Sequence, residues 1–126
     1  FGRILDRFPR MKLVCSEFEI AWIPAFMWRL DQMQVDFGHR LDLPTLDMKA
    51  SDYMRERIWH GVIDDPFAAE AAAKIGTDRV MWGSDFPHVR SIGLDAQSRL
   101  LSMFEGLDED AAEQIVGGTV ADVFAV

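Results

Sequence analysis

The 126 residues of this chain are enough for one domain, and their hydrophobic fraction of 49% suffices for a packed core, which argues against a disordered chain. No stretch approaches the ~20 consecutive apolar residues that a membrane-spanning helix requires. The 21 acidic residues outnumber the 13 basic ones, and the net charge of −8 argues against a nucleic-acid partner. The single cysteine, Cys15, excludes an internal disulfide and a cysteine-cluster zinc site, and it predicts a cytoplasmic location.

The first third of the chain has the pattern of a strand followed by a helix. Residues 1–8 have the features of a helix end that Pro9 stops, so we expect the chain to begin partway through a fold. Residues 11–16 form a short apolar run typical of a buried strand. Apolar side chains then recur at helical spacing over residues 20–33, with Pro24 in the first turn, where a missing N–H costs little.

The middle of the chain repeats this order after an irregular segment. Residues 38–50 show no period, so we expect a loop there. Ser51 is expected to cap a short helix over residues 52–57. An apolar run over residues 57–63 then predicts a second strand.

The C-terminal half adds a third strand between helices. Asp65 followed by Pro66 marks the start of a helix over residues 67–75, and residues 80–83 form the next apolar run.

Helical patterns follow over residues 95–104 and 109–116. We expect the second of these helices to end at Gly117-Gly118 and Thr119 to cap a separate last turn over residues 120–124. The alternation of strands and helices predicts a parallel α/β sheet covered by helices.

Two carboxylates follow strands in this order, Glu17 after the first and Asp85 after the third. In parallel α/β folds functional side chains lie at the carboxyl ends of strands. Because side chains alternate along a strand, we expect Glu17 to share the inner face with Leu13 and Cys15, and Asp85 to share it with Met81. A carboxylate in an apolar mouth must be paired, hydrogen-bonded or bound to a metal. Spacing alone leaves open the alternative that Asp85 only caps a turn.

The three histidines differ in their expected roles. His88 follows Asp85 by three residues and can reach the same mouth, where histidine suits metal binding or proton transfer. His60 lies at the centre of a predicted strand and is expected to be a hydrogen-bonded core residue. His39 falls in the irregular loop and is expected to face solvent.

Several segments together resemble the amidohydrolase-related family, a group of metal-dependent hydrolases and decarboxylases that includes enzymes like aminocarboxymuconate-semialdehyde decarboxylase. The segments that carry the resemblance are residues 8–14, 63–66, 75–88 and 115–124. The resemblance implies that residues 1–126 are the last three strand–helix units of a (β/α)8 TIM barrel, with no second domain. A complete barrel takes ~250 residues, so about half of it would lie outside this chain.

The resemblance also implies roles for particular residues. Asp85 matches the aspartate on strand eight, which binds a divalent metal and handles a proton; the metal is expected to be zinc, with manganese as the alternative. Glu17 stands where many members carry a catalytic histidine, and it is expected to act as a base or orienting group. His88, Trp22 and Phe86 are expected to contact substrate. The remaining metal ligands of the family would lie upstream of this chain.

The function expected from this resemblance is hydrolysis, or decarboxylation, of a small organic acid, lactone or amide with a metal-bound water. The expected partners are a small-molecule substrate and the missing N-terminal half of the barrel or another chain, and we expect a homo-oligomer. An open three-stranded sheet would expose Leu13, Cys15 and Met81. The alternative is a truncated half-barrel without catalysis that acts as a structural or interaction module.

Overall fold

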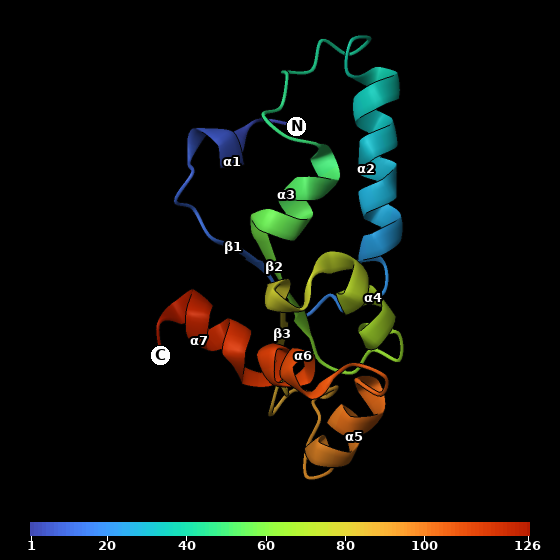
Figure 1. The fold of residues 1–126 in the computed structure, drawn as a ribbon, viewed down its shortest axis with the longest axis vertical. Coiled ribbons are helices and arrows are strands. Elements are labelled where there is room, and N and C mark those ends of the chain that lie inside the picture. The colour runs from blue at the N-terminus through green and yellow to red at the C-terminus, as the bar shows by residue number, and fades with distance from the viewer.

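A computed structural model describes all of residues 1–126 and confirms a parallel α/β arrangement (Figure 1). In chain order the elements are α1 (Ile4–Arg7), β1 (Leu13–Cys15), α2 (Ile23–Phe37), α3 (Ala50–Glu56), β2 (Ile58–Val62), α4 (Ala68–Ile75), the 3₁₀ turn η1 (Thr77–Arg79), β3 (Val80–Trp82), α5 (Ala96–Met103), α6 (Glu109–Glu113), the π-helical turn η2 (Gln114–Gly118) and α7 (Thr119–Phe124). The three strands pair in parallel in the order β1-β2-β3, so β1 and β3 form the two edges of the sheet.

The main core lies between one face of this sheet and the helices that follow each strand. Its buried members from the strands are Val62 and Val80, and the helices contribute apolar residues from α2, α4 and η2. Ile23 and Ile75 are among them, and both are fully buried. Burial of such side chains contributes ~1.5–3 kcal/mol each, so this layer fixes the strand ends that carry the candidate site.

The register of the sheet corrects the expected inner face of β1. Cys15 pairs with His60, and His60 pairs with Val80, so these three residues point to the helix side of the sheet. Leu13 and Cys15 therefore do not share a face with Met81, which pairs with Gly61 on the opposite side. The prediction was wrong because it assumed that the alternation of side chains in β1 continues as far as Glu17. The backbone leaves the strand before that residue, which has a φ of 63°.

Met81 was expected to be exposed on the open sheet, but it is buried. It is 7% exposed, and Val120 and Phe124 of α7 line the same cleft as Met81. Helix α7 is held beside this cleft by hydrogen bonds with the segments that precede β1 and β3. The Thr119 hydroxyl donates to the carbonyl of Thr77 before β3 at 3.3 Å, and the Lys12 ammonium before β1 donates to the carbonyl of Val123.

The start of α3 corrects a second local prediction. The helix begins at Ala50, and Ser51 lies inside it as a buried residue instead of capping it. The capping acceptors come from α2: the Ser51 N–H donates to Asp31 Oδ1 at 2.9 Å, and the Ala50 N–H donates to Gln34 Oε1 at 2.8 Å. A tertiary contact thus replaces the local cap.

The C-terminal helix corrects a third local prediction. Gly117-Gly118 does not end a helix, because α6 continues through the π-helical turn η2 into α7. Thr119 lies inside this continuous helix, 1% exposed, instead of capping a new one. A π-helical turn accommodates an extra residue within a helix without ending it.

His60 is the hydrogen-bonded core residue that its position in the strand predicted. Its side chain is 1% exposed, Nε2 donates to the Met54 carbonyl at 3.0 Å, and Nδ1 has no partner. Burial lowers the pKa of His60 below its usual value of 6.5, against a smaller opposing effect of the Met54 carbonyl. The folded state therefore favours the neutral imidazole.

This burial predicts a pH-dependent stability. Because the folded pKa lies below the unfolded one, the contribution of neutral His60 is fully present above about pH 6.5 and is lost as the pH falls from there towards the folded pKa. We expect the Tm to fall between about pH 7.5 and pH 5.5, and His60→Gln to reduce that fall. Thermal unfolding followed by circular dichroism would measure it. His39→Gln, at an exposed position, serves as control and should keep the slope; an unchanged slope in His60→Gln would contradict the prediction.

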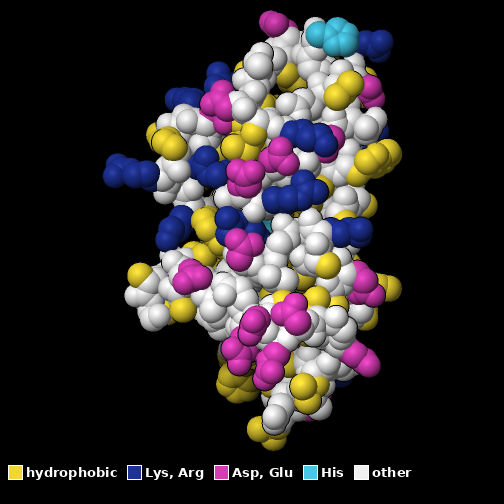
Figure 2. All heavy atoms as spheres, in the orientation of Figure 1, with side chains coloured by type: hydrophobic (Ala, Val, Ile, Leu, Met, Phe, Trp, Pro, Cys, Tyr) yellow, Lys and Arg dark blue, Asp and Glu magenta, His cyan; other side chains and the backbone are white.

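The surface carries the acidic balance of the sequence unevenly. Figure 2 shows Asp and Glu gathered over the lower part of one face, while Lys and Arg in its upper part are interleaved with acidic side chains. Asp108, Glu109 and Asp110 at the start of α6 are exposed. None of the helices combines the length and hydropathy that crossing a bilayer requires.

Candidate active site at the carboxyl ends of the strands

Asp85 lies directly beyond β3. Hydrogen bonds hold the chain on both sides of it: the Gly83 N–H donates to the Val62 carbonyl at 3.0 Å, and the Ile92 N–H donates to the Ser84 carbonyl at 3.0 Å. Asp85 itself has a φ of 54°, a left-handed conformation that few residues other than glycine adopt.

The carboxylate of Asp85 is not used to hold this turn. Its side chain is 19% exposed, and no N–H or O–H in the structure donates a hydrogen bond to it. The turn is closed instead by the backbone carbonyl of Asp85, which accepts from the His88 N–H at 2.8 Å. A half-buried carboxylate without donors is costly, so this oxygen pair is available to a cation or a proton.

Glu17 lies beyond β1 and shares a cleft of about 250 Å³ with Asp85. Its side chain is exposed, and the rest of the cleft is mostly apolar, with Met81 and the α7 residues Val120 and Phe124 in its wall. Gly83 leaves open space beside Asp85, since a Cβ there would meet nothing within 4 Å. The cleft therefore combines two carboxylates, apolar walls and room for a small ligand.

His88 and Phe86 lie near Asp85 but do not line this cleft. Nδ1 of His88 is 3.7 Å from Asp85 Oδ2, and its side chain is 73% exposed, so it can approach the carboxylate from outside. Phe86 is 75% exposed. Both side chains belong to the loop between β3 and α5, on the rim of the site.

Trp22 lies apart from Asp85 and Glu17. It lines a separate surface cleft with Phe67 and Lys74, and its ring packs edge-on against Phe26 with centroids 5.3 Å apart. Its indole N–H donates to the carbonyls of Phe18 at 2.9 Å and Glu19 at 3.0 Å. Trp22 thus contacts the loop that carries Glu17 and not the cleft itself.

Two carboxylates near the site were missed from the sequence. Asp65, 3% exposed, accepts the N–H groups of Ile20 at 3.0 Å and Ala21 at 2.7 Å with Oδ2. In return Glu19 accepts the N–H groups of Ile63 at 3.0 Å and Asp64 at 3.3 Å. Each of the loops after β1 and β2 therefore supplies a carboxylate that accepts backbone N–H groups of the other loop. The pattern Asp65-Pro66 indicated a helix cap, and Asp65 Oδ1 does accept the Phe67 N–H at 3.0 Å, but its second role was not visible locally.

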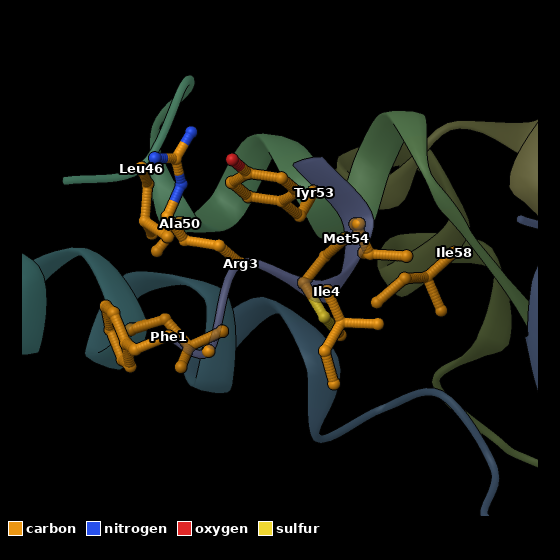
Figure 3. A pocket seen from close by; sticks show the side chains of 11 residues that line it. Phe1, Arg3, Ile4, Leu46, Ala50, Tyr53, Met54 and Ile58 are labelled. Carbon is orange, nitrogen blue, oxygen red and sulfur yellow. The ribbon is translucent and has the colours of Figure 1, made fainter. Parts of the chain in front are cut away.

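A second, mostly apolar cavity lies at the opposite end of the strands. A cavity of about 230 Å³ is lined by residues of α1 and α3 and by Ile58, the first residue of β2 (Figure 3). The Tyr53 hydroxyl at its edge already donates to Asp6 and accepts the Asp47 N–H at 3.1 Å. This cavity is separate from the carboxylates at the mouth.

The donor set fits a divalent cation only in part. Asp85 offers a carboxylate of the kind that zinc and manganese accept, with no competing hydrogen bond. The chain brings together no group of three histidine, cysteine or acidic residues that could hold a metal ion. Residues 1–126 can thus contribute a ligand to a metal centre whose other ligands come from elsewhere.

The sequence matches the protein family described as Amidohydrolase over residues 1–126. The chain therefore belongs to the amidohydrolase family. A search of curated proteins found no match.

The chain is also similar to solved structures. It is similar to 5-carboxyvanillate decarboxylase LigW from Sphingomonas paucimobilis, with a TM-score of 0.84 and 26% identity over 99% of this chain and 37% of that one. It also shares the fold of an amidohydrolase from Mycobacterium avium subsp. paratuberculosis K-10, with a TM-score of 0.78 and 19% identity over 96% of this chain and 30% of that one. A dihydroxybenzoic acid decarboxylase from Polaromonas sp. JS666, solved with bound manganese and the inhibitor 2-nitroresorcinol, gives a TM-score of 0.70 and 19% identity over 98% of this chain and 36% of that one.

These comparisons confirm the expected family and fold class. The chain spans 30–37% of the length of the three relatives, and its three parallel strands are a portion of a TIM barrel. Two of these relatives are described as decarboxylases and one as an amidohydrolase.

Proposed function

We propose that this chain supplies the C-terminal part of the active site of a metal-dependent enzyme that hydrolyses or decarboxylates a small organic acid, lactone or amide. The observation that carries the proposal is the carboxylate of Asp85, half-buried at the end of β3 in a cleft and free of hydrogen-bond donors. In barrel enzymes the loops at this end of the strands form the active site.

Asp85 has two tasks in this proposal. Its carboxylate would hold the cation, and it would accept a proton from a group that reacts beside it. The bound cation would polarise a carbonyl or carboxylate oxygen of the substrate. Glu17, which lines the same cleft, would act as a base or orient the substrate. Apolar contacts with Met81 and Phe124 would hold an apolar portion of the ligand.

Two rim residues and one residue of a neighbouring cleft complete the proposed site. His88 would contact substrate from outside the cleft, close to Asp85, and Phe86 would cover the opening as an exposed aromatic ring. Trp22 would act from the neighbouring cleft, through the loop that carries Glu17.

The rest of the site would come from the remainder of the barrel. The unpaired edges of β1 and β3 would pair with its strands, either in the same polypeptide or in another chain, and further association into a homo-oligomer is part of the proposal. A non-catalytic half-barrel is not favoured, because it gives no role to the Asp85 carboxylate, to which no N–H or O–H donates a hydrogen bond. A cytoplasmic location fits the free cysteine, Cys15.

Metal analysis of the complete protein tests this proposal. We expect about one equivalent of zinc, or of manganese as in the Polaromonas relative, and loss of activity on chelation that either ion restores. Elemental analysis of the purified protein and turnover of a panel of lactones, amides and aromatic acids before and after chelation are the measurements. A protein that turns over substrate at an unchanged rate after complete metal removal would refute the proposal.

A further inference from the structure

The loops after β1 and β2 are tied together by the exchanged carboxylates of Glu19 and Asp65. We propose that these two residues are positioning residues for Glu17: they hold the β1–α2 loop in the conformation that places Glu17 in the cleft. The inference rests on the proposed function of that cleft, and it assigns a task to two residues that take no part in the cleft lining.

The conformation of the loop explains why it needs such support. Glu17 and Glu19 both have left-handed backbones, with φ of 63° and 54°. A left-handed backbone is unfavourable for a residue other than glycine and persists only where surrounding contacts hold it. Asp65 accepts the two N–H groups that follow Glu19 directly, those of Ile20 and Ala21. We call the carboxylates of Glu19 and Asp65, with the N–H groups that donate to them, the clamp. The clamp therefore acts at the C-terminal end of the strained segment.

The chemistry of the clamp requires carboxylates on both sides. No lysine, arginine or histidine forms an ion pair with Glu19 or Asp65, so backbone N–H groups are their partners. Asp65 uses both oxygens, Oδ2 for Ile20 and Ala21 and Oδ1 for Phe67. An asparagine of the same shape would turn an N–H₂ group towards one of these donors. Asp65→Asn should therefore open the clamp without changing side-chain volume.

Trp22 provides a spectroscopic reporter of this loop. Its indole N–H donates to the carbonyls of Phe18 and Glu19, both within the segment that contains the left-handed residues Glu17 and Glu19. The indole resonance in a ¹H–¹⁵N spectrum, assigned with Trp22→Phe, thus responds to loop geometry and does not require substrate or metal.

The experiment compares Asp65→Asn, Glu19→Gln and the control Asp64→Asn in the full chain. Asp64 contacts Glu19 only through its backbone N–H, and its side chain is 42% exposed and pairs with Arg99 at 3.5 Å, so Asp64→Asn leaves the contact between the loops in place. We expect Asp65→Asn and Glu19→Gln to shift the Trp22 resonance, and Asp65→Asn to speed hydrogen exchange of the Ile20 and Ala21 N–H groups. Asp64→Asn should leave both as in the wild type.

Activity of the complete enzyme gives the second measurement. We expect Asp65→Asn to lower kcat on the order of 10-fold or more. Combined with Glu17→Gln it should cause no further loss, because the clamp acts through Glu17. If Asp65→Asn does not fold, Glu19→Gln, at a less buried position, carries both measurements.

The outcomes separate this inference from the proposed function. Unchanged Trp22 resonance and exchange rates in both clamp variants would overturn the inference, even in an active enzyme. A lower Tm with unchanged resonance and unchanged kcat would overturn it as well, since the carboxylates would then support only α4. Failure of the proposed function would appear elsewhere, as metal-independent turnover, while the Trp22 measurement would still decide whether the clamp holds the loop.

Discussion

Asp85→Asn in the complete enzyme is expected to lower kcat on the order of 10²–10⁴-fold while leaving the fold intact. The amide is a weaker ligand for a cation and cannot accept a proton at the pH of the reaction, so both proposed tasks are lost. The fold should be unaffected, because no N–H or O–H donates to this carboxylate and the turn is closed by its backbone carbonyl. Steady-state kinetics, elemental analysis and thermal unfolding of the same preparation measure the three effects.

A second variant in the same loop serves as control. Asp95 lies at the other end of the segment between β3 and α5, and its exposed carboxylate pairs with Arg99 at 3.2 Å. Asp95→Asn removes one negative charge from the loop without touching the cleft, and it should keep metal content and kcat. Wild-type activity and metal content in Asp85→Asn would remove Asp85 from the mechanism.

The sequence was sufficient to locate Asp85 because its signal is local. An apolar strand followed by a carboxylate defines a strand end, and parallel topology brings such ends to one edge. The same argument located Glu17, and the structure brings the two into one cleft. Alternation within the strands failed for Leu13 and Cys15, because the left-handed backbone at Glu17 interrupts the period that the prediction assumed.

Contacts between distant segments could not be predicted in this way. Asp65 binds N–H groups 44 and 45 residues away, and Ser51 is held by Asp31, 20 residues away on another helix. In both cases a local pattern indicated a cap, and the tertiary partner either added to that cap or replaced it. Such partners become visible only when the fold has brought two loops or two helices together.

The second large expected effect is on stability, and it concerns a buried side chain in the continuous C-terminal helix. Ile115 lies in η2, fully buried in the core cluster that also contains Val80, the first residue of β3. Ile115→Ala removes three carbons from a site that the surrounding backbone keeps open, and it should lower the free energy of unfolding by about 2–5 kcal/mol. Urea unfolding at constant pH measures the change.

Val116, the next residue, gives a matched control. It is 39% exposed, so Val116→Ala should change the free energy of unfolding by less than about 1 kcal/mol. The difference in unfolding free energy between the two variants tests whether the helix continues through the π-helical turn. If the helix ended at Gly117-Gly118, as its glycines indicated, the last turn before it would fray and Ile115 would anchor little. Because the helix instead runs on into α7, Ile115 fixes the segment that packs beside Met81 and bounds the cleft of Asp85. Equal, small effects of both variants would show that this helix is not anchored on β3.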